Sequence, residues 1–307
     1  MLLMKFSCLI VGLGKVGMMY DFYNPTFRTH LSAIHKLNNF YIKGAVDKSH
    51  YKRKKFEKKF NAPSFSDLLE AVTKLKPSIL IIAVNTDNVS KIYEKIIRNK
   101  LKFKAIIFEK PVANKVEIAK KIFKYCNNNK IYVFVNYMRR YDKSIEKIKK
   151  LIDENKLGLI KEIKVNYKKG FINSCSHYIN FLDYLNLINK KIKVFKITKF
   201  SKNDNQINFV IKNSFDVNFN FFKKNSIDEK IIIYGELLSI EYLTEKGIIK
   251  IISKNKDRYI KNNYSKPFKS VYENIRDVLM IKKNPKSSIN DSLRTLEIIN
   301  IVLSKKN

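Results

Sequence analysis

The chain has 307 residues, enough for two domains of ordinary size, and its 45% hydrophobic residues exclude wholesale disorder. Its apolar runs stay below the roughly 18 residues of a membrane-spanning helix, so we expect no membrane partner. Three cysteines, Cys8, Cys126 and Cys175, are too few and too scattered for a disulfide framework or a zinc cluster, and we expect no metal site.

Basic residues are in large excess: 62 Lys and Arg against 27 Asp and Glu give a formal net charge of +35. Such a charge is typical of proteins that bind nucleic acids or anionic membranes. Here the excess is nearly all lysine, is spread along the chain, and accompanies no zinc finger, RRM-like signature or basic zipper. We attribute it to compositional drift and expect no nucleic-acid partner. A positive surface would also suit an anionic substrate such as a sugar phosphate or nucleotide sugar.

The first part of the chain alternates strand-like and helix-like segments. Met1–Val11 runs into a glycine motif without a small-residue cleavage site, which favours a first buried strand over a signal peptide. We therefore expect a cytoplasmic location. Apolar residues recur at helical spacing in Asp87–Asn99 and Asn114–Tyr125. This alternation predicts a doubly wound, mostly parallel sheet. The expected strands are Phe6–Val11, Tyr41–Val46, Ser78–Val84, Phe103–Phe108 and Ile131–Val135.

The second part of the chain has a different pattern. Helices are expected at Asp142–Glu154 and from about Ser176 to Asn189, and two more, Pro267–Ile281 and Ile289–Ser304, close the chain. Consecutive strands with short turns predict a large, mostly antiparallel sheet. We therefore expect a Rossmann domain over residues 1–137 and an α+β substrate and oligomerisation domain over 138–307. The expected strands are Lys161–Tyr167, Lys193–Phe200, Ile207–Lys212, Asp216–Phe222, Lys230–Tyr234, Leu238–Leu243 and Ile248–Ser253.

A G-x-G-x-x-G motif follows the first expected strand and is expected to open a helix; it consists of Gly12, Leu13, Gly14, Lys15, Val16 and Gly17. The first glycine permits the tight turn, the second lets the backbone approach a pyrophosphate, and the third lets the helix pack on the strand. The helix N-terminus then offers free N–H groups to the phosphates. The alternative is a turn that needs glycine for backbone reasons only.

Asp47 ends the second expected strand, where a carboxylate accepts hydrogen bonds from the adenosine ribose. It lies 30 positions after Gly17, and the segment Tyr20–Thr29 accounts for the extra length of this crossover. An acid at this position favours NAD, whereas the nearby Lys48 and Arg53 leave NADP open. The alternative role of Asp47 is a helix N-cap, for which Ser49 is an equal candidate.

Several further landmarks occur in order. Asn85-Thr86-Asp87-Asn88 follows the third strand, Glu109-Lys110-Pro111 follows the fourth, and Asn136-Tyr137-Met138-Arg139-Arg140-Tyr141 follows the fifth; His177 begins a helix in the second part. With these landmarks the sequence resembles the Gfo/Idh/MocA oxidoreductases, the group of glucose–fructose oxidoreductase and inositol dehydrogenase. The resemblance implies a carbohydrate-related oxidoreductase whose substrate binds between the second sheet and the nicotinamide.

The resemblance also implies roles for individual residues. Asn85 and Glu109 would lie at the cofactor site, with Glu109 orienting the loop or Lys110. Lys110 would hydrogen-bond the reacting oxygen, and the Lys-Pro peptide after it is often cis in this family. His177 would act as the base that takes the hydroxyl proton. Arg140 is a candidate substrate contact, its alternative being a charged helix entry.

The sequence departs from the family pattern beside His177. Active members usually carry aspartate four residues before this histidine, where this chain has Asn173, and often aspartate three residues after it, where the chain has Asn180. Asparagine can hold a substrate hydroxyl by hydrogen bonds, but it carries no charge that would raise the basicity of the imidazole. Catalysis by Lys110 and His177 is therefore expected to persist, or to be altered or slow.

Two functions remain in competition. The first is an NAD(P)-dependent oxidoreductase acting on a secondary hydroxyl of a sugar, cyclitol or nucleotide-linked sugar. The second is a catalytically silent dinucleotide- or sugar-binding regulatory protein on the same fold. A cysteine nucleophile that uses Cys175 with His177 is disfavoured, because residues two positions apart do not lie on the same face of a helix. An open sheet face commonly needs cover, so we expect a homo-oligomer, a dimer or a tetramer.

Overall fold

The computed structural model describes residues 5–168, 170–188, 193–199, 207–212, 214–222, 227–261 and 266–305; for Asn173, Lys193, Phe195, Thr198 and Lys199 it describes the backbone alone. By its internal contacts the chain divides into two compact units. The first comprises Met1–Tyr141 with Ser265–Leu293, and the second Asp142–Tyr264 with Arg294–Asn307. The domain boundary expected after residue 137 stays a prediction.

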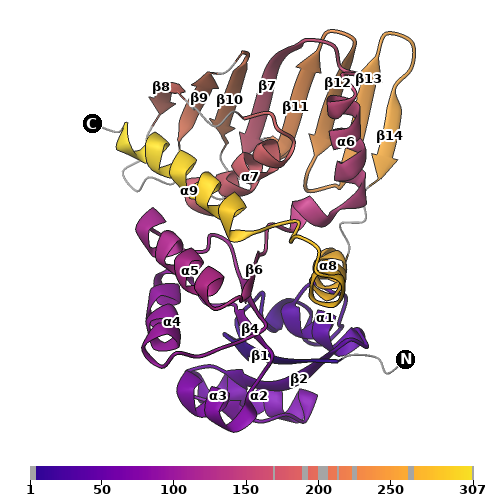
Figure 1. Ribbon diagram of the computed structural model, residues 1–307. Helices are drawn as coiled ribbons and strands as arrows, with labels where there is room; N and C mark the ends of the chain where they lie inside the picture. The colour runs from indigo at the N-terminus through magenta and orange to yellow at the C-terminus, as the bar shows by residue number, and fades with distance from the viewer. Residues whose placement is uncertain are drawn as a thin grey trace. The chain divides into compact units, whose positions relative to one another are not determined.

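The first unit is built on a six-stranded parallel sheet in the order β3-β2-β1-β4-β5-β6 (Figure 1). The five strands expected from the sequence are confirmed, and the two-residue β3 was not expected. β1, β4 and β5 are buried along their whole length, which explains their nearly uninterrupted apolar sequences. The strands are β1 (Phe6–Val11), β2 (Phe40–Val46), β3 (Ser64–Phe65), β4 (Ile79–Ile82), β5 (Ala105–Phe108) and β6 (Tyr132–Val135).

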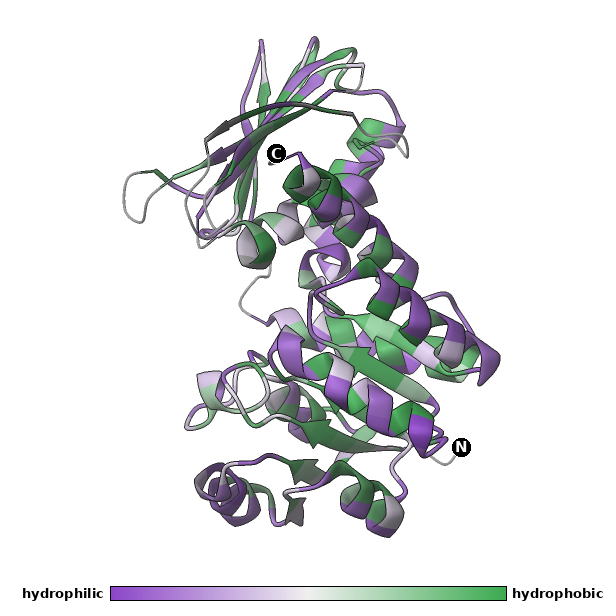
Figure 2. Ribbon diagram, turned by 90° about the vertical axis from the view of Figure 1, so that its left-hand side faces the viewer, coloured by the Kyte–Doolittle hydropathy of each residue, from purple (hydrophilic) through white to green (hydrophobic). Residues whose placement is uncertain are grey.

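The helices of this unit carry one hydrophobic side toward the sheet, as their two-coloured ribbons show (Figure 2). They are α1 (His30–Lys36), α2 (His50–Phe60), α3 (Leu68–Leu75), α4 (Thr86–Arg98), α5 (Val116–Asn128) and, from the end of the chain, α8 (Pro267–Ile281). Phe268, Tyr272 and Ile275 of α8 join the core beneath β1 and β2. Of the helices in the described ranges, none is long and apolar enough to cross a membrane.

The first crossover begins with a short helical segment. The sequence predicts that the glycine motif opens a helix. The chain makes one hydrogen-bonded turn, in which the N–H of Met18 donates to the carbonyl of Gly14 (2.9 Å), and then a short 3-10 helix at Met19–Asp21. α1 begins only at His30, because a segment is inserted after this first turn.

α1 nevertheless continues the interrupted turn. The N–H of His30 donates to the carbonyl of Val16 (3.1 Å), and the N–H of Leu31 donates to that of Gly17 (3.2 Å). The helical hydrogen-bond ladder thus passes across the insertion. The expectation that Tyr20–Thr29 lengthens this crossover is confirmed.

A buried carboxylate organises the insertion. Asp21 accepts hydrogen bonds from the N–H groups of Thr26 (2.9 Å) and Arg28 (2.8 Å) and from the hydroxyl of Thr29 (2.6 Å). These bonds hold the pKa of Asp21 below its ordinary value, although burial acts in the opposite direction. Thr29 in turn forms a capping box with Ser32 at the start of α1.

The second unit carries an eight-stranded sheet in the order β14-β13-β12-β11-β7-β10-β9-β8 (Figure 1). Neighbouring strands are antiparallel except β7 and β10, so the expectation of a mostly antiparallel sheet is confirmed. Phe200, the last residue of one expected strand, lies outside the described residues, and β14 was not expected. The strands are β7 (Ile160–Tyr167), β8 (Lys193–Lys199), β9 (Asn208–Lys212), β10 (Asp216–Phe221), β11 (Lys230–Gly235), β12 (Leu238–Leu243), β13 (Ile248–Ser253) and β14 (Arg258–Lys261).

One face of this sheet is covered by helices. Alternate residues of β7, namely Ile163, Val165 and Tyr167, are fully buried, as expected for a sheet with one covered face. The covering helices are α6 (Lys143–Asp153), α7 (Ser176–Tyr184), which follows a π-helical turn at Phe171–Cys175, and the later part of α9 (Ile289–Ser304).

Candidate active site

Two glycines of the motif are required by the protein's own packing. Gly12 has φ +103°, and a Cβ there would lie 2.5 Å from the carbonyl oxygen of Ala83. A Cβ on Gly17 would lie 2.1 Å from the carbonyl oxygen of Gly12. The first allows the turn after β1, and the second allows the following helical turn to pack against it.

Gly14 has no such internal reason. A Cβ built there meets no atom of the protein within 4 Å. Its backbone therefore faces open space, at the point where the motif would bring the chain close to a pyrophosphate. Packing accounts for Gly12 and Gly17, whereas the absence of a side chain at Gly14 fits the close approach of a ligand. The motif thus fits a dinucleotide.

Asp47 holds the glycine turn. Its Oδ2 accepts a hydrogen bond from the N–H of Leu13 (2.7 Å), and its Oδ1 accepts one from the N–H of Ser49 (2.8 Å). The N-cap of α2 is Ser49, whose side chain accepts from Lys52, so the capping alternative for Asp47 does not apply. Arg53 donates to the backbone carbonyl of Asp47 (2.8 Å).

A cavity of about 460 Å³ adjoins this turn. Gly12, Val46 and Asp47 lie on one side of it, and Val84 with Asn88 of α4 on another. Asn85, predicted from the resemblance to be at the cofactor site, is exposed at the N-terminus of α4 and does not line this cavity. The full lining is Val11, Gly12, Val46, Asp47, Lys48, Ser66, Asp67, Leu68, Val84, Asn88, Lys91, Ile92 and Lys95.

The remaining residues of the glycine motif differ in burial. Leu13 is fully buried, Val16 is half-buried and Lys15 is exposed. Within the cavity, Lys95 forms an ion pair with Asp67, which also caps α3. This side of the cavity is therefore polar and carries both signs of charge.

Glu109 and Lys110 follow β5, and the peptide between Lys110 and Pro111 is cis. Glu109 Oε1 accepts hydrogen bonds from Nδ2 of Asn136 (2.6 Å) and from Nε2 of His30 (3.0 Å). The other imidazole nitrogen of His30 bonds the hydroxyl of Tyr272 (2.9 Å). The Glu109 carboxylate is thus held by a network of buried side chains.

Lys110 is largely shielded from solvent. Burial lowers the pKa of its ammonium group from 10.5 to about 8, the neighbouring Glu109 carboxylate raises it, and the Arg139 guanidinium lowers it further. A lysine with such a pKa can donate a proton or a hydrogen bond near neutral pH, which suits stabilisation of a reacting oxygen.

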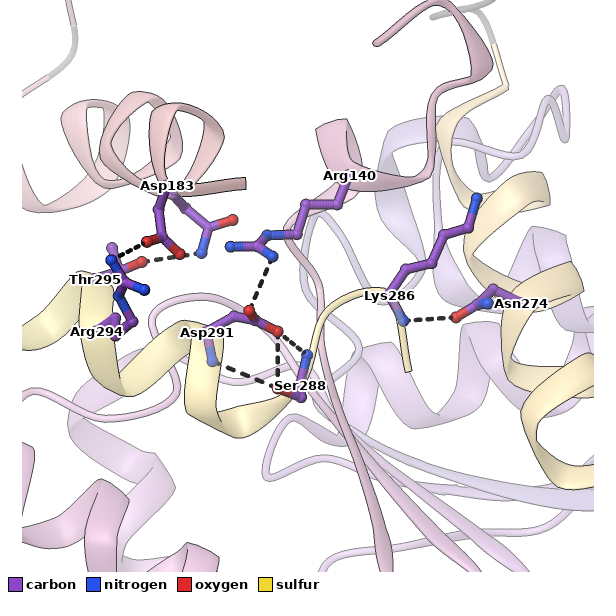
Figure 3. A network of polar contacts seen from close by, with 9 residues as sticks. Arg140, Asp183, Asn274, Lys286, Ser288, Asp291, Arg294 and Thr295 are labelled. Carbon is purple, nitrogen blue, oxygen red and sulfur yellow. Dashed lines mark hydrogen bonds and ion pairs between the residues drawn. The ribbon is translucent and has the colours of Figure 1, made fainter. Parts of the chain in front are cut away.

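Arg140 is engaged within the first unit. Its side chain is 5% exposed, and Nη1 lies 2.9 Å from Oδ1 of Asp291 (Figure 3). The other carboxylate oxygen of Asp291 accepts from the N–H and the hydroxyl of Ser288 at the start of α9. Arg140 thereby links the segment after β6 to α9. This structural role is the alternative to a substrate contact. Its predicted substrate role stays a prediction.

His177, the second residue of α7, belongs to the second unit and is half-buried. Asn180 is buried and donates to the hydroxyl of Thr295 on α9 (2.9 Å), so this asparagine serves packing between helices. Asp183 pairs with Arg294 (2.7 Å; Figure 3). The side chain of Asn173 lies outside the described part of the chain.

Two further expectations concern cysteine and metal chemistry. Cys175 is fully buried, and burial raises its pKa well above the ordinary value, so no reactive thiolate forms there. Within the described ranges, His, Cys, Asp and Glu side chains form no group of three that could hold a metal ion.

Sequence reasoning missed three residues of the site. His30 resembles a histidine that is common at this place in the family but was given no catalytic role, Asn136 served only as a landmark, and Tyr272 was assigned to a closing helix of the second domain. For His30, this resemblance was the signal that could have found it. Tyr272 could not be found, because nothing in its sequence neighbourhood shows that α8 packs on the first unit.

Comparisons with known proteins were made for the whole chain. Residues 6–137 match the model of a family described as "Oxidoreductase family, NAD-binding Rossmann fold" (GFO_IDH_MocA). The comparison with curated proteins gave no significant match. Many solved structures share the fold.

Three of these structures illustrate the likeness. The WlbA dehydrogenase from Bordetella pertussis, in complex with NADH and UDP-GlcNAcA, is 16% identical with a TM-score of 0.80, covering 98% of this chain and 95% of that chain. KijD10, a 3-ketoreductase from Actinomadura kijaniata in complex with NADP, is 11% identical with a TM-score of 0.80, covering 98% and 97%. An oxidoreductase from Agrobacterium radiobacter, in complex with NAD+, L-tartaric acid and magnesium, is 12% identical with a TM-score of 0.77, covering 98% and 96%.

At these identities the likeness to solved structures is one of fold. The family model covers the six strands of the first sheet, the glycine turn, Asp47 and the Glu-Lys-Pro segment described above. Residues 6–137 of this chain therefore match the model of the Gfo/Idh/MocA oxidoreductase family, which is described as an NAD-binding Rossmann fold.

Proposed function

We propose that the chain is an NAD(P)-dependent oxidoreductase that transfers a hydride between nicotinamide and a secondary hydroxyl of a sugar, a cyclitol or a nucleotide-linked sugar. The observation that carries the proposal is the open space at Gly14, which the protein's packing leaves unexplained and a pyrophosphate explains. Two of the structurally similar proteins support this substrate and cofactor class. One was crystallised with NADH and the nucleotide sugar UDP-GlcNAcA, and the other with NADP.

The chemistry requires a hydride acceptor and a group that handles the hydroxyl proton. The nicotinamide ring, when bound, supplies the hydride exchange. Lys110 donates a hydrogen bond to the reacting oxygen and stabilises negative charge on it. His177 takes the hydroxyl proton, and Asn173 binds the substrate through its amide. Gly12, Gly14 and the free N–H groups after them bind the pyrophosphate.

The cofactor is proposed to be NAD, with NADP as the second choice. Asp47 lies on the cavity beside the glycine turn, and its charge opposes a 2′-phosphate. Arg53, which could have favoured NADP, is engaged with the backbone carbonyls of Asp47 and Lys48. Lys48 itself is exposed on the rim of the cavity and is the residue through which NADP could be accepted.

The first test is thermal unfolding of the purified chain with NAD, NADH, NADP or NADPH. A ligand that binds only the folded state at about 100 times its Kd adds about 2.7 kcal/mol of stability. A shift with one redox pair identifies the cofactor, and a coupled screen of sugars, cyclitols and nucleotide sugars then follows nicotinamide absorbance. The absence of a shift with all four nucleotides would refute the proposal.

A specific observation favours a second candidate, a regulatory protein that binds dinucleotide or sugar without turnover. Asn180 is committed to Thr295, so it is engaged in helix packing. A regulatory protein would bind NADH but support no hydride exchange with any sugar tested, and its Lys110→Ala variant would keep ligand affinity. Turnover that Lys110→Ala abolishes would exclude it.

Assembly as a homo-oligomer is also proposed, with the uncovered face of the second sheet as the contact surface. The outer positions of β7 and β11, such as Lys164, Ile232 and Tyr234, are only half-buried within one chain. Light scattering after size exclusion distinguishes a monomer from a dimer or tetramer.

A further inference from the structure

A histidine without a role in the proposed chemistry lies at the centre of the Glu109 network. His30 is 0% exposed, and both of its ring nitrogens are engaged, Nδ1 with the Tyr272 hydroxyl and Nε2 with Glu109. Its ring also packs edge-on against Phe268, at 4.7 Å between centroids. A buried imidazole held on three sides has one orientation only.

The partners determine where the protons lie. A carboxylate can only accept, so Nε2 carries the proton that points to Glu109. In the tautomer that has no proton on Nδ1, the Tyr272 hydroxyl donates to Nδ1. Burial raises the pKa of Tyr272 well above its ordinary value, so this phenol keeps its proton throughout the working pH range. The chain Tyr272–His30–Glu109 is thus polarised toward the carboxylate.

Glu109 receives two such donors on one oxygen, from His30 and from Asn136. Two donors on one oxygen fix the position of the carboxylate. Glu109 is the neighbour that raises the pKa of Lys110, against the effects of burial and of Arg139. Whatever holds the Glu109 carboxylate in place therefore acts on Lys110.

We propose that His30 is a positioning residue for Lys110: it fixes the position of the neighbouring Glu109 carboxylate, and Tyr272 from α8 holds the imidazole in the orientation that does so. The catalytic meaning of this arrangement rests on the proposed function. The arrangement itself is a property of the first unit and can be measured without turnover.

The experiment measures the protonation of Lys110 directly. The full-length protein is labelled briefly with acetic anhydride at a series of pH values, and mass spectrometry of the Lys110 peptide gives the pH of half-maximal reaction. His30→Leu removes the donor, so the Glu109 carboxylate loses its fixed position, and its weaker interaction with Lys110 lowers the pKa of the lysine. The expected shift is about one pH unit downward, the size typical of losing a close opposite charge.

Three further variants test the assignment. His30→Gln places an amide N–H where Nε2 stands and should restore most of the original value. Tyr272→Phe should shift Lys110 in the same direction as His30→Leu, by a smaller amount. Tyr125→Phe is the matched control, because it removes a partly buried hydroxyl of the same unit whose partner is the carbonyl of Leu101; it should leave Lys110 unchanged.

The outcomes separate the two proposals. If folded His30→Leu and Tyr272→Phe leave the Lys110 titration unchanged, or if Tyr125→Phe shifts it equally, the positioning role is overturned. NADH binding of the unsubstituted protein, measured in parallel, reports on the proposed function alone. A protein that binds no NADH yet shows the shifts retains the positioning role and loses the catalytic one.

Discussion

The N–H of Leu13 lies 2.7 Å from Oδ2 of Asp47, so the carboxylate at the end of β2 anchors the turn that follows β1. The two residues are 34 positions apart and come together because β1 and β2 are adjacent and parallel. One carboxylate oxygen therefore shapes the phosphate loop, while the other is held by the N–H of Ser49. The position of the acid is part of the loop's architecture as well as of its ligand preference.

Replacing Gly14 should separate binding from folding. Gly14→Ala is expected to leave the free energy of unfolding unchanged or slightly higher, since the new Cβ meets no protein atom and alanine restricts the unfolded chain. NADH affinity should fall at least about tenfold, or about 1.4 kcal/mol, because the methyl group occupies the space of the pyrophosphate. Urea unfolding and isothermal titration give the two quantities.

Gly17→Ala is the control with the opposite pattern. Its Cβ would lie 2.1 Å from the carbonyl of Gly12, so the helical turn must move away from β1. We expect a loss of roughly 1–3 kcal/mol of stability, in the range of overpacked sites. Equal stability losses in both variants would contradict the assignment of Gly14 to the ligand.

Asp47→Asn tests the preference for NAD. The amide keeps a single acceptor oxygen, so either Leu13 or Ser49 loses its partner, and the charge that opposes a 2′-phosphate disappears. NADH affinity should fall about tenfold, or about 1.4 kcal/mol, while NADPH affinity falls less or rises. Dissociation constants for both nucleotides, measured on both proteins, check the ratio. A ratio that does not change would assign Asp47 to loop structure alone.

The fold could be predicted from the sequence wherever a segment's burial determines its composition. β1, β4 and β5 are buried on both faces and are uninterrupted apolar runs, so their existence and order were evident. β3 and β14 were not: β3 has only two residues, and β14 is mostly exposed and has no apolar run to mark it. The break after Gly17 was hidden for another reason: the hydrogen bonds that carry α1 across it join residues 14 positions apart.

Lys110→Met should stabilise the protein while abolishing catalysis. In the folded state the pKa of Lys110 lies at about 8 rather than 10.5, so the unfolded chain binds more protons between these values. The free energy of unfolding therefore rises with pH through this window, and below pH 8 the full cost of burying the ammonium group remains. Met removes that cost, so the variant should gain up to roughly 3 kcal/mol at pH 7. The gain should decline toward zero by about pH 10.5.

The same pKa predicts the pH dependence of the reaction. The hydrogen bond to the reacting oxygen needs the ammonium form of Lys110, so kcat/KM should decrease as pH rises through about 8. Urea unfolding of the unsubstituted protein and of Lys110→Met between pH 6 and about 10, beside the kinetic profile, tests both statements. A Met variant that is less stable at pH 7 would show that Lys110 is held by contacts stronger than its burial cost.

The ion pair of Arg140 with Asp291 can be tested by a double-mutant cycle. Arg140 is 5% exposed, and the Asp291 carboxylate offsets part of the cost of burying its charge. Asp291→Asn should cost about 3 kcal/mol of stability, and the coupling energy with Arg140→Met should be about 1–3 kcal/mol. Asp153→Asn, which breaks an exposed pair with Lys149, should cost below about 1 kcal/mol. A change of KM in Arg140→Met without loss of stability would instead favour the substrate role.

Asn173→Asp should increase activity if His177 is the base. A carboxylate near the imidazole stabilises its protonated form and raises its basicity. We expect kcat/KM to rise about tenfold or more, with the acid limb of the pH profile moved to higher pH. The gain should disappear in the Asn173→Asp, His177→Asn double variant. An aspartate that leaves both the rate and the profile unchanged would place the proton transfer elsewhere.

The candidate site was only partly accessible from the sequence. The glycine motif, Asp47 and Lys110 could be found because each lies at the end of a strand, and parallel strands end at one edge of their sheet. The network behind Glu109 could not, since it depends on His30 and Tyr272, which are 242 positions apart. Its contacts arise only when the chain, having built the second unit, returns with α8 to the first.

The inserted segment after the first helical turn interrupts the helix that the glycine motif opens. α1 continues this helix in register, because the N–H of His30 donates to the carbonyl of Val16. This hydrogen bond does not involve the inserted segment itself, although Phe22 and Phe27 of that segment pack against the core of the first unit. The hydrogen bond from the Thr29 hydroxyl to Asp21 stabilises the inserted segment without involving β1 or β2. The segment is thus a ready point of variation, where related chains can differ in length, or a foreign peptide can be grafted, while the dinucleotide turn a few residues away keeps its shape.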